Sequence, residues 1–286
     1  MSNFNILEVV ASCPSIKIID IGAMSIGDEI YTALVQAGLA KIVGFECVQA
    51  ECDKLNAMSR GTHTYLPHAV GDGRERTFHT CSASMTSSIY EPNTPLLERF
   101  QNLANLTQVV SRETIPTVRL DELPEVQGAD FLKLDVQGAE LDILNGAGQT
   151  LADLVVIHTE VEFVPLYKEQ PLFAEVDQHL RRAGFVFHKL HSVGERTFKP
   201  LVFNNDLNQG LSQMLWGDAV YVRDFMALDA VPAEKLLKMA VILHVVYGSF
   251  DLVLQVLRAY DAKANAATAS AYFTRLTGQV APPGEL

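Results

Sequence analysis

The 286-residue sequence predicts an α/β fold with a mainly parallel sheet of about seven strands. Short runs rich in Ile, Val and Phe alternate with amphipathic stretches through residues 1–228, as they do in β-α-β units. This alternation then stops, and residues 233–275 have a helical pattern throughout. We therefore expect an α/β domain over residues 1–228 and a helical C-terminal appendage over residues 229–286.

The expected strands are β-rich runs bounded by turn residues. In chain order they are Ile16–Ile21, Ile42–Glu46, Tyr65–Val70, Phe131–Asp135, Leu154–Thr159, Phe185–Leu190 and Ala219–Arg223. Helices are expected between them where apolar residues recur at spacings of three and four. The clearest are residues 28–37, which Gly38 ends, and Leu172–Ala183, which Gly184 ends.

Residues 77–118 show little periodicity and are expected to form a long loop. Its segments SASMTSS (82–88) and EPNTP (91–95) are polar. Loops of this length in compact domains are usually functional or disordered. Ser87 and Ser88 are candidate substrate-binding residues, because their hydroxyls can hydrogen-bond a hydroxylated ligand. A solvated loop explains them nearly as well.

The C-terminal segment is expected to form a helical hairpin, with two helices joined near Gly248 and Ser249. Its apolar residues suit a contact between two copies of the chain. These residues are Leu236, Leu237, Val241, Ile242, Val245 and Val246. Packing of the hairpin on its own domain would hide the same surface, so both arrangements stay open.

The composition narrows the classes of partner. The net charge is −12, and an acidic surface repels nucleic-acid phosphates and anionic lipids. The N-terminus lacks the basic start of a secretory signal, and charged or polar residues interrupt the most apolar segment. The four cysteines form no CxxC pair. We expect a cytoplasmic protein without a membrane span.

A glycine-containing turn follows the first expected strand and leads into a helix. It reads DIGAMSIG, from Asp20 to Gly27, and the next strand ends in Glu46. Glycine allows the backbone to approach a ligand, and a carboxylate at the second strand can accept hydrogen bonds from ribose hydroxyls. The dinucleotide pattern GxGxxG is absent, so a cationic amino-acid ligand suits Asp20 better. A plain tight turn with a capping Asp is the alternative.

The most distinctive stretch is DFLKLDVQGAELDILNGA, residues 130–147. Lys133 and Asp135 lie on one face of the expected strand, because side chains alternate along it. Asp135 falls at the carboxyl end, where open α/β sheets bind ligands. Gly138 opens the next helix, and Glu140 lies in its first turn, where the helix dipole favours a carboxylate.

This stretch resembles the signature of the FkbM family of S-adenosylmethionine-dependent methyltransferases. DIGAMSIGDE is similar to the family's first cofactor motif, GFE to its second, and HAVGD (68–72) to the turn after the third strand. The resemblance covers roughly residues 16–190. Two departures stand out: the first turn is one residue longer, and Gln137 replaces the usual Glu.

The resemblance implies a Rossmann-like class I methyltransferase fold and a set of site residues. Those around the methionine part of the cofactor would be Asp20, Gly22, Ala23 and Gly27. Glu46 would bind the ribose, and Asp72 or its neighbours would approach the adenine. Lys133, Asp135 and Glu140 would line the site of methyl transfer, with Asp135 also next to the cofactor.

The fifth expected strand carries three titratable side chains on one face: His158, Glu160 and Glu162. His158 is a candidate general base, because its ordinary pKa lies near neutral pH. Glu160 would orient it, bind the acceptor or attract the sulfonium. The alternatives are a core histidine, an ion pair between Glu162 and Arg181 or Arg182, and a metal site of Asp135, His158 and Glu160.

Taken together, these features predict an S-adenosylmethionine-dependent O-methyltransferase. The family resemblance implies a hydroxyl acceptor on a sugar, glycan or natural product, with Asp135 or His158 receiving the proton. A nucleotide-dependent oxidoreductase is one alternative. A non-catalytic cofactor-binding or interaction module is the other.

Overall fold

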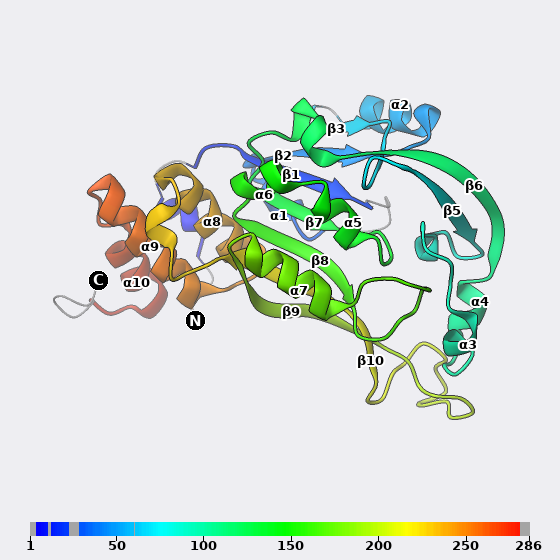
Figure 1. Cartoon of the computed structure of the whole chain (residues 1–286). Helices are drawn as coiled ribbons and strands as arrows, with labels where there is room; N and C mark the ends of the chain where they lie inside the picture. Colours follow the sequence, from blue (N-terminus) through cyan, green and yellow to red (C-terminus); the bar gives the residue numbers. More distant parts are fainter. Residues whose placement is uncertain (1–3, 11–12, 23–28, 60, 281–286) are drawn as a thin grey trace.

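The computed structural model describes residues 4–10, 13–22, 29–59 and 61–280, and its centre is a seven-stranded sheet (Figure 1). The strands are β1 (Ile16–Ile21), β2 (Ala40–Phe45), β3 (His63–Leu66), β7 (Phe131–Leu134), β8 (Val156–Glu162), β9 (Phe185–Glu195) and β10 (Met214–Arg223). Their order is β3-β2-β1-β7-β8-β10-β9. The pairs from β3 to β8 are parallel, and β10 is antiparallel to β8 and β9. The predicted mainly parallel sheet is confirmed.

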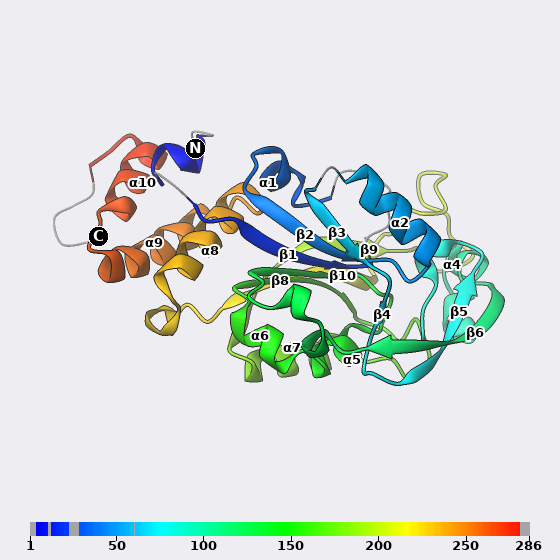
Figure 2. The same cartoon turned by 90° about the horizontal axis from the view of Figure 1, so that it is seen from above.

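Helices cover both faces of this sheet (Figure 2). Ile16 and Ile18 of β1 belong to one buried apolar cluster, and Ile19 and Ile21 belong to a second. The first cluster includes residues of α1 (Thr32–Gln36) and α8 (Ala233–Val245). The second includes residues of α5 (Glu140–Asn145), α6 (Gly148–Asp153) and α7 (Phe173–Arg182). Burial on both faces explains why the central strands are nearly continuous apolar runs.

The expected loop at 77–118 was wrong, because much of this segment is ordered. A second sheet has the order β4-β6-β5, with strands β4 (Ala69–Val70), β5 (Glu75–Cys81) and β6 (Val109–Val118). β5 and β6 are antiparallel. Most of β6 is exposed. A strand that buries so little shows no apolar alternation, so its sequence does not reveal it.

We call residues 82–108 and 196–213 the cap. The first segment carries α3 (Thr94–Leu97) and α4 (Leu103–Leu106), and the second connects β9 to β10. The two segments meet where Phe100 stacks on Phe198, with ring centroids 4.4 Å apart. Backbone hydrogen bonds run from Gln101 to Thr197 and from Lys199 to Arg99. A third apolar cluster lies here, separate from the two clusters of the sheet.

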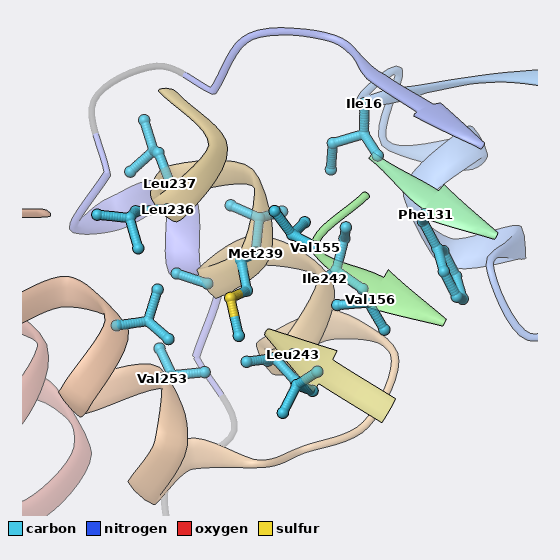
Figure 3. Close-up of a cluster of buried hydrophobic side chains, with 14 of the residues drawn as sticks. Ile16, Phe131, Val155, Val156, Leu236, Leu237, Met239, Ile242, Leu243 and Val253 are labelled. Carbon is cyan, nitrogen blue, oxygen red and sulfur yellow. The ribbon is translucent and has the colours of Figure 1, made fainter. Parts of the chain in front are cut away.

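Three C-terminal helices follow the sheet, one more than the expected hairpin: α8, α9 (Phe250–Ala264) and α10 (Thr268–Thr277). The side chains of α8 enter the same apolar cluster as Ile16, Phe131 and Val156 (Figure 3). Of the six expected interface residues, Leu236, Leu237, Val241 and Ile242 are buried there, and Val245 and Val246 are half-buried. This part of the apolar tail therefore packs on its own domain.

A buried carboxylate fastens α8 to the sheet. Asp130, just before β7, is fully buried and accepts hydrogen bonds from Lys235 Nζ at 2.7 Å and Lys238 Nζ at 3.2 Å. Its second oxygen also accepts the backbone N–H of Lys17 at 2.8 Å. Two lysines of α8 thus neutralise the buried Asp130 carboxylate. Through Asp130, the starts of β1 and β7 are both linked to α8.

α2 (Gln49–Met58) packs beside β3 at the edge of the sheet. Within the described ranges, no helix is both long enough and apolar enough to span a bilayer.

Candidate active site

Asp20 and Lys133 form a buried ion pair between β1 and β7. Lys133 Nζ donates to Asp20 Oδ1 at 3.2 Å, and the hydroxyl of Tyr31 donates to Asp20 Oδ2. Lys133 Nζ also lies 3.5 Å from Glu29 Oε2. Burial opposes the charge of Lys133, but the attraction of Asp20 and Glu29 outweighs it and raises the pKa of Lys133. This ion pair therefore joins the first sequence motif, which begins at Asp20, to the second motif, which contains Lys133.

Gly22 marks a close approach of the turn after β1 to the end of β7. Its φ is +92°, and a Cβ at this position would lie 1.8 Å from the carbonyl oxygen of Asp135. Only glycine fits, both because of the left-handed backbone and because of this contact. Ala23 and Gly27, the other expected cofactor residues of this turn, lie outside the described residues.

Glu46 directly follows β2, at the carboxyl edge of the sheet. It is half-buried, and its Oε1 accepts the backbone N–H of Val48 at 2.8 Å. The carboxylate forms no ion pair with any residue the structure describes. It is thus placed as the sequence predicts and keeps acceptor capacity for a diol.

Asp72, which was expected to approach the adenine, forms an ion pair with Arg76. Arg76 Nη2 lies 2.6 Å from Asp72 Oδ2, and the same guanidinium reaches Asp142 at 3.4 Å. Burial raises the pKa of Asp72, but hydrogen bonds from Arg76 and the backbone of Arg74 more than offset this and lower it. Its carboxylate is largely taken up by these contacts, and it does not line the cavity described below.

A tight turn carries the chain from β7 into α5. Gln137 and Gly138 both have left-handed backbones, with φ values of +57° and +95°. Glu140 Oε1 accepts the backbone N–H of Val136 at 2.9 Å and closes the turn. Burial raises the pKa of Glu140 to about 7. Glu140 therefore shapes the turn and is not among the residues that line the cavity.

The side-chain amide of Gln137 connects two acids, Asp135 and Glu160. Its Nε2 donates to Asp135 Oδ1 at 2.9 Å and to Glu160 Oε2 at 2.6 Å. Its Oε1 accepts from the hydroxyl of Tyr167 at 3.2 Å. An amide supplies two donors without adding charge. The departure from the family's usual Glu thus has a structural role here.

Glu160 and Glu162 lie on the same face of β8 and are both buried. Burial raises the pKa of each carboxyl well above its usual range, and the neighbouring acids raise it further. The suggested ion pair of Glu162 with Arg181 or Arg182 was wrong. Arg181 pairs with Asp177 at 2.7 Å, and Arg182 donates to Gln178.

His158 lies on the same strand but under the C-terminal helices. It is 3% exposed, and its Nδ1 lies 3.2 Å from the hydroxyl of Tyr247. Burial, with His191 and Lys133 nearby, lowers the pKa of His158 to about 3. It does not line the cavity. Its position matches the core-histidine alternative better than the general-base hypothesis.

A cavity of about 430 Å³ opens at the carboxyl ends of β1, β7 and β8. Its polar side contains Gly22, Lys133, Asp135, Gln137, Glu160 and Glu162. The other lining residues come largely from the cap and from segments next to it, and they include Leu97, Leu103, Leu106, Leu166, Arg196 and Trp216. Four expected catalytic residues were Asp135, His158, Lys133 and Glu160, and all but His158 meet here.

The expected substrate residues Ser87 and Ser88 hold the cap in place. Ser88 is buried, and its hydroxyl donates to the backbone oxygen of Gln137 at 2.7 Å. Ser87 Oγ accepts the backbone N–H of Cys81 at 3.0 Å. Their neighbours Met85 and Thr86 line the cavity instead.

Several cavity residues were not found from the sequence: Glu29, Tyr167, Arg196 and Trp216. The first three come from connections between elements, and Trp216 lies in β10, before the part of that strand that the sequence pattern predicts. Asp135, His158 and Glu160 do not form a metal cluster, and the described part of the chain contains no group of three or more His, Cys, Asp or Glu placed to hold a metal ion.

The sheet order, with its antiparallel last pair, and the cavity at the carboxyl edge define a Rossmann-like methyltransferase fold. The sequence matches the family described as the methyltransferase FkbM domain over residues 20–187. That match spans more than half of the chain, which therefore belongs to the FkbM family of S-adenosylmethionine-dependent methyltransferases.

Solved structures with similar folds are remote in sequence. Precorrin-6y C5,15-methyltransferase from Geobacter metallireducens GS-15 is 12% identical, with 76% of this chain and 85% of that chain covered and a TM-score of 0.36. The 23S rRNA methyltransferase ErmE is 10% identical, with 88% and 79% covered and a TM-score of 0.34. An NADB-Rossmann superfamily protein from Streptococcus agalactiae is 12% identical, with 91% and 98% covered and a TM-score of 0.36. No curated protein matches the chain.

Proposed function

We propose that this methyltransferase uses S-adenosylmethionine to methylate a hydroxyl of a small-molecule acceptor. The observation that carries the proposal is the cavity at the carboxyl edge, where Asp135 lies beside the Gln137 bridge. Of the acceptors implied by the sequence resemblance, a natural product suits the cavity best. Of the cap residues that line it, Met85, Leu97, Leu103 and Leu106 are apolar, whereas a glycan would require more hydrogen-bonding groups than Thr86, Thr107 and Arg196 provide.

The residues at the sheet edge fit the cofactor. Glu46 has a carboxylate oxygen that no described cation pairs, at the strand end where a ribose diol would lie. Gly22 brings the turn after β1 against Asp135, and both residues line the cavity. We expect Glu46 to hold the ribose, and Asp135 to lie next to the methyl donor.

Bound at this edge by Glu46 and next to Asp135, S-adenosylmethionine would supply a sulfonium methyl group for transfer to the acceptor oxygen and would be left as S-adenosylhomocysteine. The protein must orient the acceptor and receive its proton. Orientation alone can supply about 7–11 kcal/mol of the barrier, and a general base about 10²–10⁴-fold in rate. Orientation of the acceptor in the cavity is therefore expected to lower the reaction barrier more than the general base does.

Asp135 is the better candidate for the proton acceptor. It lines the cavity, and Gln137 fixes its carboxylate from one side. Burial raises the pKa of Glu160 well above its usual range, which favours the neutral carboxyl, a hydrogen-bond donor to the acceptor rather than a base. His158 is a weak base, because its pKa is lowered to about 3, and it lies outside the cavity.

The cofactor assignment is tested by calorimetric titration with S-adenosylmethionine and S-adenosylhomocysteine, with NAD as the comparison. We expect both sulfur ligands to bind and NAD to bind more weakly. Glu46→Gln should reduce their affinity about 10–100-fold, because hydrogen bonds to a charged group contribute ~1.5–3 kcal/mol. Glu51→Gln is the matched control, because Glu51 is an exposed carboxylate paired with Lys54. Preferred binding of NAD would point to the oxidoreductase alternative.

A further inference from the structure

Arg196 is an unusual cation in the wall of the cavity. Its Nη1 donates to the backbone oxygen of Glu195 at 2.8 Å, and its guanidinium stacks over Trp216, 5.1 Å from the ring centroid. Its Nε is buried and has no hydrogen-bond partner in the described structure. Asp206 attracts it only from beyond ion-pair distance. A buried donor without a partner is costly, so the guanidinium is incompletely satisfied by the protein.

The two described cations that line the cavity differ in whether a carboxylate neutralises them. Lys133 is neutralised by Asp20 and Glu29, at 3.2 and 3.5 Å. Arg196 forms no ion pair with any described residue. An anion entering the cavity is repelled by Asp135 on the polar side, so its binding point is Arg196. A planar guanidinium can hold a carboxylate with two parallel hydrogen bonds.

The surroundings of Arg196 are apolar. Trp216 can lie flat beside β9 because the residue opposite it is Gly194: a Cβ there would lie 1.9 Å from the ring. Leu97, Leu103 and Leu106 of the cap line the same cavity. The 196–213 segment of the cap also exposes apolar side chains to solvent, namely Phe198, Leu201, Leu207 and Leu211.

We propose that the acceptor is a hydroxylated apolar carboxylic acid, with its carboxylate on Arg196 and its apolar body against Trp216 and the cap leucines. Its hydroxyl would then lie at Asp135, which lines the same cavity. This inference rests on the proposed function, because it names the substrate class of the same site. It assigns to Arg196 the role of a specificity-determining residue that binds the acceptor and leaves the cofactor contacts untouched.

The single tryptophan of the chain provides a direct test, because its fluorescence reports on the cavity wall. The probes are two matched pairs: 3-hydroxydecanoate with its amide, and 4-hydroxyphenylacetate with its amide. Each is titrated against Trp216 emission, with and without S-adenosylhomocysteine. We expect at least one acid to bind about 10–100-fold more tightly than its amide. Arg196→Gln should abolish that preference.

Arg258→Gln is the matched control, because Arg258 is an exposed arginine of α9 whose Nη1 donates to Gln255 Oε1 at 3.4 Å. Equal affinity for acid and amide, an unchanged preference in Arg196→Gln, or no saturable binding of either acid would overturn the inference. Failure of the proposed function has a separate signature. In that case S-adenosylhomocysteine would not bind by calorimetry, whereas the fluorescence titration without cofactor would still report the acid preference.

Discussion

Lys133 Nζ lies 3.2 Å from Asp20 Oδ1, across 113 residues of sequence, in the buried space between β1 and β7. This contact connects the turn expected to bind the cofactor with the motif expected to carry the chemistry. Lys133 also lines the cavity, together with Asp135.

Removing one partner of this pair should destabilise the protein strongly. Lys133→Met leaves Asp20 buried and uncompensated, which costs ~3–5 kcal/mol. The double variant Asp20→Asn with Lys133→Met should lose clearly less than the sum of the single variants, because it leaves no buried charge. Urea unfolding of all four proteins measures the coupling. Additive losses would contradict the assignment of an interacting buried pair.

The attachment of α8 through Asp130 can be tested in the same way. Asp130→Ala leaves Lys238 buried against the sheet and should cost ~3–5 kcal/mol of unfolding free energy. Glu234→Ala removes an exposed partner of the same lysine, 2.9 Å away, and should cost under ~1 kcal/mol. Similar losses in both variants, measured by denaturant unfolding, would argue against a special role for Asp130.

Gln137→Glu should make stability more sensitive to pH. A third carboxyl would lie between Asp135 and Glu160, where Gln137 Nε2 is now 2.9 and 2.6 Å from their oxygens. Its pKa in the folded state would rise, so stability would be lost as pH increases from 5 to 8, by ~1–3 kcal/mol. Gln137→Met adds no charge and should keep the wild-type pH dependence. Parallel pH curves for both variants would refute this account.

Glu140 gives the wild-type protein a pH dependence of known sign. Its pKa is raised from 4.5 to about 7, so the folded state holds a proton that the unfolded state releases. Its contribution to stability is present below pH 4.5 and lost as pH rises to about 7, at most ~3 kcal/mol. Glu140→Gln retains an acceptor for Val136 and should become relatively more stable over this interval. A constant stability difference from pH 4 to 8 would contradict the raised pKa.

Two substitutions separate the candidate bases. Asp135→Asn should reduce turnover about 10²–10⁴-fold with any acceptor that supports methylation. His158→Gln should retain turnover within about threefold, because His158 does not line the cavity and is uncharged at neutral pH. Calorimetric binding of S-adenosylhomocysteine confirms that each variant is folded. The reverse ranking would return the base assignment to His158.

Much of the sheet could be predicted because its strands are buried on both faces. β1 and β7 appear in the sequence as the apolar runs IKIIDI and FLKL, and two of the polar residues that interrupt them, Asp20 and Lys133, are candidate site residues. β5 and β6 escaped prediction, because a strand pair with exposed side chains carries little apolar pattern. The third C-terminal helix, α10, was missed because a pattern of helical residues does not show where one helix ends and another begins.

The sequence by itself determined the α/β class, the family and the residues at the ends of β1 and β7, because local patterns and motif spacing encode them. The tertiary structure alone decided which of those residues face the cavity. It buried His158 under Tyr247, joined Lys133 to Asp20 and brought Arg196 and Trp216 to the same cavity as Asp135. The reason is physical: accessibility and charge partners depend on contacts between segments far apart in the chain, which no local pattern specifies.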